Sequence, residues 1–372
     1  MRRLFCVFVG AAVLFASSGV ARAQQPDPLD AAIGKLKDKD PNLRRQAAVE
    51  LARLRDPKAV PGLLDALSDP DAPVRSAVID TLGLLRAGGP KIAERLTKDP
   101  DASVRTQAAI SLTYLGDPST EDALVKALSD PSLSVRFAAA RTAGNLRAEK
   151  AVPKLVEMLS APDVATRQAA VAALERIGSR QSLDALVATA GDSDAAVRQQ
   201  AIRALAAIGD RSAADAIKTK LADPDIQVRV QAALALGRFG DNSGLPVGID
   251  LLKNPEARLR QQGAQVVGAL GDQQAGLKAL DDSFQSEKDP ATKQMIDLAR
   301  AQLKARLGVR ESAPTVSAVD TTKAGTTQAT VDTGKTTVTQ ATVNTGKAKT
   351  KPAQKRRVKK KTPAPPSPPK TP

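Results

Sequence analysis

The chain has 372 residues, a formal net charge of +15 at neutral pH and an aromatic content of only 2%. It contains no histidine, and its single cysteine is Cys6. Histidine is the commonest catalytic base, and thiolates serve as nucleophiles, metal ligands and disulfide partners. The composition therefore argues against histidine-dependent catalysis, thiolate metal sites and a disulfide framework. We expect no enzymatic activity, no catalytic residue, no metal and no other cofactor.

The first 23 residues have the pattern of a secretory signal peptide. Met1-Arg2-Arg3 is positively charged, the stretch from Leu4 to Ala16 is apolar, and Ala21-Arg22-Ala23 is a small-x-small cleavage signal. The apolar stretch is too short for a membrane-spanning helix. We expect cleavage before Gln24, export across the inner membrane, and a mature protein in the periplasm or cell envelope. An N-terminal membrane anchor is the alternative interpretation.

An internal repeat governs the next part of the chain. A Val-Arg dipeptide, or Leu-Arg or Thr-Arg in its place, occurs eight times at steps of 30 or 31 residues, within the pattern D-P-x-x-x-V-R-x-x-A-A-x-x-L-x-x-L-G-D. Self-similarity at such a period is typical of solenoids. The recurring arginines are Arg44, Arg75, Arg105, Arg136, Arg167, Arg198, Arg229 and Arg260.

Each repeat is predicted to form a helical hairpin. Counted from the residue before the arginine, apolar or small residues stand at positions 0, 4, 8 and 11, which lie on one face of an α-helix. A shorter apolar helix follows, anchored in the first repeat by Leu63 and Leu67, and an Asp-Pro turn opens the next repeat. Glycines at position 12 are expected to end the first helix in the left-handed conformation. They are Gly116, Gly178, Gly209, Gly240 and Gly271.

These repeats resemble the short HEAT-like repeats of the phycobilisome-lyase type, a branch of the HEAT and armadillo solenoids. The resemblance covers residues 29–308 and implies an all-α fold, a right-handed α–α superhelix of about eight 31-residue helical hairpins in a domain of residues 24–308. Ala161 and Thr166 depart from the pattern, and the eighth repeat is eroded at Gly263 and Ser283. Because the family includes scaffolds, bilin-attachment partners and metal-dependent hydroxylases, the resemblance leaves the function open.

The recurring arginines are interpreted as part of a structural ladder. In HEAT-type stacks a turn aspartate and a helix arginine resemble such a ladder, in which charge-assisted hydrogen bonds join the same or adjacent repeats. Arg136→Ala is accordingly expected to lower stability by on the order of 1–3 kcal/mol. The predicted acceptors for the eight arginines are Asp69, Asp99, Asp130, Asp192 and Asp223.

Positions 2, 6 and 10 of the first helix point away from its apolar face and vary between repeats. They hold six arginines and one acidic residue, together with two aromatic residues in adjacent repeats. Arginine and aromatic side chains are enriched in binding hot spots, and in the resembled family this helix lines the concave surface. We expect a surface for an acidic or amphipathic protein partner, with an ordinary solvated face as the alternative. The candidate partner-binding residues are Tyr114, Phe137, Arg141, Arg176, Arg203 and Arg238.

The helical periodicity ends after Gly308. Residues 309–354 form a Thr/Ala-rich low-complexity linker, and residues 355–372 form a basic, Pro-rich tail that begins Lys355-Arg356-Arg357-Val358-Lys359-Lys360-Lys361. Sequence of this kind buries too little apolar surface to fold, so we expect disorder. In an exported protein the basic block favours anionic envelope polymers or lipid headgroups over nucleic acid. A plain solvated linker is the alternative.

Three functions stay open on the sequence alone. The first is a monomeric, non-enzymatic scaffold of the periplasm or cell envelope that binds a protein partner on its concave helix face. The second is a lyase or maturation factor that acts on a partner protein, as in bilin lyase HEAT proteins. The third is a binder of anionic envelope polymer through the basic tail.

Overall fold

A computed structural model describes residues 27–309. In this part of the chain every regular element is a helix and no strand occurs. The predicted all-α stack of helical hairpins is therefore confirmed. The predicted signal peptide, the basic tail and all of the linker except Val309 lie outside the described residues.

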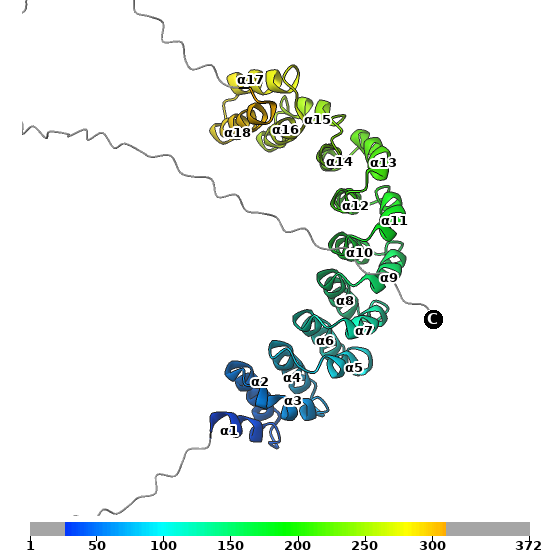
Figure 1. Ribbon diagram of the computed structural model, residues 1–372, viewed down its shortest axis with the longest axis vertical. Helices are drawn as coiled ribbons and strands as arrows, with labels where there is room; N and C mark the ends of the chain where they lie inside the picture. Colours follow the sequence, from blue (N-terminus) through cyan, green and yellow to red (C-terminus); the bar gives the residue numbers. More distant parts are fainter. Residues whose placement is uncertain (1–26, 310–372) are drawn as a thin grey trace, which may run out of the picture. The chain divides into compact units, whose positions relative to one another are not determined.

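The α-helices alternate between two layers, and Figure 1 shows the longer ones along the inner side of the curved stack. We call these the long-helix layer and the short-helix layer. The long helices are α2 (Pro41–Leu54), α4 (Ala72–Leu84), α6 (Ala102–Leu115), α8 (Leu133–Leu146), α10 (Val164–Ile177), α12 (Ala195–Ile208), α14 (Ile226–Arg238), α16 (Ala257–Leu270) and α18 (Pro290–Leu307). The short helices are α1 (Pro28–Lys35), α3 (Val60–Ala66), α5 (Gly89–Lys98), α7 (Glu121–Ala127), α9 (Val152–Met158), α11 (Leu183–Thr189), α13 (Ala214–Thr219), α15 (Leu245–Leu251) and α17 (Gly276–Ser286).

Single turns of 3-10 helix complete the connections. Most of them lead from the end of a long helix into the next short one, where an aspartate or serine often caps the turn. The repeat pattern does not predict these turns. They span Pro57–Ala59, Pro118–Thr120, Glu149–Ala151, Arg180–Ser182, Arg211–Ala213 and, after α13, Lys220–Ala222.

The long helices bury a wider face than the predicted one. In α6 the predicted core residues Val104, Ala108 and Leu112 are fully buried. Position 5 is fully buried in all eight repeats as well, because each long helix packs against its neighbours within the layer as well as against the short helices. The position 5 residues are Ala48, Ile79, Ala109, Ala140, Val171, Ile202, Ala233 and Ala264.

Four of the five predicted stop glycines adopt the left-handed conformation. The prediction is wrong for Gly271, whose φ is −58° and ψ 150°. There the chain leaves α16 in an extended conformation, because Arg306 of α18 donates hydrogen bonds to the carbonyls of Ala269 and Gly271 and the backbone of Gly276 lies against Gly271. In the three remaining repeats an arginine takes the left-handed position: Arg55, Arg86 and Arg147, with φ of 52°, 53° and 53°.

The apolar core forms two clusters. One runs from Leu29 to Phe239, and the other from Val230 to Leu303. Their boundary falls at α14. The second cluster is completed by α18, a ninth long helix whose Ile296 and Leu303 are fully buried.

Candidate partner-binding surface

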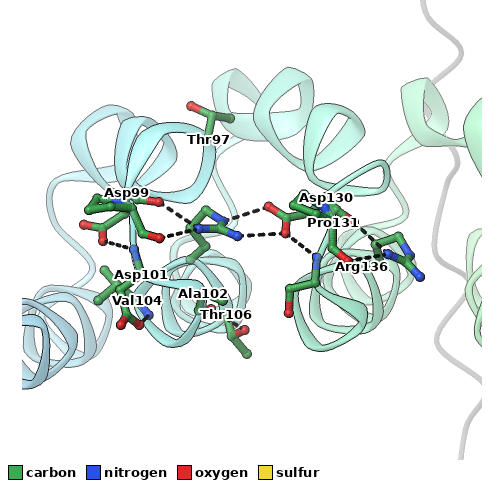
Figure 2. Close-up of polar contacts among 12 residues, drawn as sticks. Thr97, Asp99, Asp101, Ala102, Val104, Thr106, Asp130, Pro131 and Arg136 are labelled. Atoms are coloured by element: carbon green, nitrogen blue, oxygen red, sulfur yellow. Dashed lines mark hydrogen bonds and ion pairs between the residues drawn. The ribbon is translucent and has the colours of Figure 1, made fainter.

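Six of the eight ladder arginines donate two hydrogen bonds to the carboxylate of the next turn, and we call each such pair a rung. Arg105 donates from Nε and Nη2 to Asp130, at 2.8 and 3.0 Å. Its Nη1 donates to the carbonyls of Asp99 and Pro100 in its own turn, so the arginine joins two successive turns. Figure 2 labels Asp99 and Asp130, which belong to these two turns. The six rungs are Arg44–Asp69, Arg75–Asp99, Arg105–Asp130, Arg167–Asp192, Arg198–Asp223 and Arg260–Glu287.

Four rung aspartates have a pKa below the ordinary value. Burial alone raises the pKa of Asp130, but hydrogen bonds from Arg105 and from the backbone N–H of Ser132 outweigh it and bring the pKa below its ordinary value. The same balance lowers the pKa of the rung carboxylates Asp69, Asp192 and Asp223. The rungs are therefore charge-assisted links between repeats.

Glu287 is a rung acceptor that the sequence analysis missed. It follows Arg260 by 27 residues, whereas the aspartates follow their arginines by 24 or 25. Hydrogen bonding to Arg260 is the largest influence on its carboxyl group, and the pKa falls to about 2. An acidic residue close to the expected spacing was the signal that could have found it.

The ladder prediction is wrong in part for Arg136 and Arg229. Each keeps the bonds to its own turn: Nη1 of Arg136 lies 2.7 Å from the carbonyl oxygen of Asp130, and Nη1 of Arg229 lies 2.7 Å from that of Asp223. Among the described residues, however, neither arginine has a carboxylate partner. The reason is that Ala161 and Asn254 stand where a rung requires an acid.

All six candidate partner-binding residues lie on the long-helix layer. Tyr114 on α6 is 48% exposed, and Phe137 on α8 is half-buried. The four arginines are exposed on successive long helices, Arg141 on α8, Arg176 on α10, Arg203 on α12 and Arg238 on α14. The structure brings Arg176 and Arg203 together at one groove and leaves the other four outside its lining.

We call this open hollow the arginine groove. It has a volume of about 800 Å³ and crosses the C-terminal halves of α6, α8, α10 and α12. Three arginines from successive repeats reach it, and they face one acidic residue. Its lining consists of Thr113, Gly144, Asn145, Arg147, Glu175, Arg176, Arg203 and Ala207.

The groove carries an excess of positive charge. Nε of Arg203 lies 2.9 Å from Oε1 of Glu175. Among the described residues, Arg176 donates only to the carbonyl of Ala172 in its own helix, at 3.1 Å. Within residues 27–309, neither Arg147 nor Arg176 has a carboxylate partner. Arg147 was missed by the sequence analysis, although an arginine in place of the stop glycine marks the position.

Two further observations concern chemistry and membranes. In the described part of the chain, no three or more Asp, Glu, Cys or His side chains gather in a way that could hold a metal ion. None of the helices there combines the length and the apolar character needed to span a bilayer.

Stacked helical hairpins in two layers, with neighbours joined along one edge by ion pairs, define an α-solenoid. The family model for HEAT repeats matches residues 29–91, 89–166, 152–219 and 214–299. The chain therefore belongs to the HEAT-repeat family, whose repeats generally mediate protein–protein interactions. The match is to HEAT repeats as a whole, and the phycobilisome-lyase subtype stays a prediction. No curated protein matches the chain.

The solved structures that are similar to parts of the chain include the following three. An engineered protein shares 19% identity over 75% of this chain and 89% of its own, with a TM-score of 0.40. The Escherichia coli protein YibA shares 23% over 69% and 95%, with a TM-score of 0.49. Human deoxyhypusine hydroxylase, solved in complex with glycerol, shares 22% over 65% and 95%, with a TM-score of 0.31. These likenesses carry no functional information.

Proposed function

We propose that the protein is a non-enzymatic scaffold of the periplasm or cell envelope that binds an acidic protein partner in the arginine groove. One observation carries the proposal: arginines at the end of α8, on α10 and on α12 meet at a single open groove with only Glu175 against them. Solvation of a helix face does not by itself explain why arginines from three repeats line one groove.

The groove suits carboxylates for a physical reason. Guanidinium groups bind carboxylates through two parallel hydrogen bonds, and they are enriched at binding hot spots. No residue of the described chain forms an ion pair with Arg147 or Arg176, so these two arginines can bind a partner without breaking one there, whereas Arg203 is paired with Glu175. The exposed ring of Tyr114 on the neighbouring α6 adds apolar contact area near this end of the layer.

The sequence supports the rest of the proposal. The absence of histidine and of any cysteine beyond Cys6 removes the commonest catalytic side chains. The signal-peptide pattern of the first 23 residues favours export. Recovery of the tagged native protein in the cytoplasmic fraction would contradict the location.

The binding surface is tested by reversing its unpaired charges. The double variant Arg147→Glu/Arg176→Glu should capture at least about tenfold less partner from the native envelope than the native protein does. The reason is that two charge-assisted contacts become repulsive. Arg53→Glu/Arg55→Glu is the control, because Arg53 and Arg55 are exposed and occupy in the first repeat the positions of Arg176 and Arg147. Equal partner recovery by both variants, each with native helix content by circular dichroism, overturns the proposal.

A further inference from the structure

Every aspartate rung has the same three donors around its carboxylate. At Asp130 they are Nε and Nη2 of Arg105 and the backbone N–H of Ser132, the last at 2.9 Å. The backbone N–H two residues after the acid also donates, over 2.8 to 3.0 Å, at the rung acids Asp69, Asp99, Asp192 and Asp223.

At the fourth repeat the donors are present and the acid is missing. Arg136 is anchored like the other ladder arginines, with Nη1 lying 2.7 Å from the carbonyl of Asp130 and 3.1 Å from that of Pro131 (Figure 2). Its Nε and Nη2 donate to no described residue. The acceptor position is occupied by Ala161, which has only a methyl group. The backbone N–H of Asp163 interacts with the carboxylate of its own residue, which also lies within the field of Arg136, and it donates to no other described residue. The side chain that normally unites these donors is absent.

The nearby carboxylate of Asp163 does not exclude an anion. Asp163 caps α10 by accepting the backbone N–H of Thr166 at 2.7 Å. The intact rungs have the same neighbour, because the capping aspartate Asp71 follows Asp69 by two residues, and Asp194 follows Asp192 in the same way. Two carboxylates two residues apart are therefore compatible with this turn.

The other incomplete position does not offer such space. Asn254 stands at the acceptor position for Arg229, and its Oδ1 already accepts the backbone N–H of Glu256 at 2.9 Å. An amide there fills the place of the carboxylate. Among the eight repeats, only the one with Ala161 has no polar side chain at the acceptor position for its ladder arginine.

We infer that Arg136 and the backbone N–H of Asp163 form a binding site for a carboxylate supplied by another protein, either an Asp or Glu side chain or a C-terminal carboxylate. The incoming group completes the rung between the turns that precede α8 and α10. The site goes beyond the proposed function, because it lies at the N-terminal ends of these helices and shares no residue with the arginine groove.

Acetate is the first probe, titrated into the ¹⁵N-labelled full chain against sodium chloride at equal ionic strength. We expect a saturable shift of the Asp163 amide resonance in the native sequence. In Ala161→Asp, whose new carboxylate occupies the site from within, acetate should bind at least about tenfold more weakly, and the melting temperature should rise. Arg136→Gln should weaken acetate binding without raising the melting temperature.

Two peptides then separate the sources of the carboxylate. One has an internal aspartate and an amidated C-terminus, and the other has a free C-terminal carboxylate and no acidic side chain. Saturable binding of either one that is lost in Ala161→Asp supports the site and identifies its source. No saturable shift at Asp163 with any probe, or the same shift in Ala161→Asp, overturns the inference. The variant Arg147→Glu/Arg176→Glu keeps the site intact, so the two proposals fail independently.

Discussion

At the scale of single residues, the ladder arginine contributes differently to stability from one repeat to another. Its contribution depends on whether the next turn supplies a carboxylate. The side chains of Arg105 and its partner Asp130 are 13% and 9% exposed, whereas Arg136 binds only carbonyl groups among the described residues. Removing one member of a buried ion pair leaves the other charge without compensation, which costs more than losing a hydrogen bond to a neutral group.

We therefore predict that Arg105→Ala lowers the free energy of unfolding by about 3 kcal/mol and Arg136→Ala by about 1 kcal/mol. The second value lies at the lower end of the range expected from sequence, because no carboxylate is left unpaired. Urea denaturation followed by circular dichroism measures both. Equal losses for the two variants would show that the carboxylate of Asp130 does not distinguish them.

A pH prediction follows from Glu287, whose pKa is about 2 in the folded chain and has an ordinary value of 4.5. The folded state binds a proton at the Glu287 carboxyl group less readily than the unfolded state does. The rung therefore stabilises the fold fully above pH 4.5, and this contribution is lost as the pH falls toward about 2. Melting temperatures across this window should fall more steeply for the native chain than for Arg260→Met/Glu287→Leu. Parallel curves would contradict the assignment.

At the scale of elements, close approach between neighbouring long helices depends on small residues. A Cβ atom added to Gly144 of α8 would lie 3.1 Å from Cα of Ala173 in α10, closer than ordinary van der Waals contact. Gly144→Val should therefore separate the two helices and lower stability by about 1–3 kcal/mol in denaturant unfolding. Asn145→Val, at the exposed next position, is the control and should cost less; an equal loss would refute the packing explanation.

Most of each element could be predicted from the sequence, and the errors have local causes. The helix faces follow from spacing, so Val104, Ala108 and Leu112 are buried as expected. The burial of position 5 was missed because it depends on how repeats stack; the carbonyl of Ala48, for example, accepts a hydrogen bond from Thr81 of the next long helix. Gly271 was mispredicted because α18, more than thirty residues later, binds its carbonyl group.

At the scale of the whole solenoid, the boundary between the two core clusters at α14 coincides with the incomplete position of Arg229 and Asn254. Across that boundary, the side chains of Gln227 and Gln262 exchange two hydrogen bonds, at 3.1 and 2.9 Å. Neutral amide bonds couple repeats more weakly than a charged rung. Since each repeat contacts only its neighbours, a weak interface divides the stack into units that can open separately.

Hydrogen exchange should therefore show α16 and α18 opening before α6 to α12. Asn254→Asp supplies the missing carboxylate to Arg229 and should slow exchange in α16 and α18 while leaving α6 unchanged. Uniform exchange along the native chain, or no effect of this variant, would show that the boundary does not separate units.

The sequence by itself determines the repeat, its helix faces and the register of the arginines, because these depend on residues within one hairpin. The surface residues Tyr114, Phe137 and Arg141 could likewise be placed on the long helices from spacing alone. Only the tertiary structure decides which arginines find a carboxylate, that Arg147 joins Arg176 and Arg203 at one groove, and that Arg136 keeps free donors beside Ala161. Those outcomes depend on the side chain that the next repeat brings alongside, and stacking between repeats, rather than spacing within one, sets that arrangement.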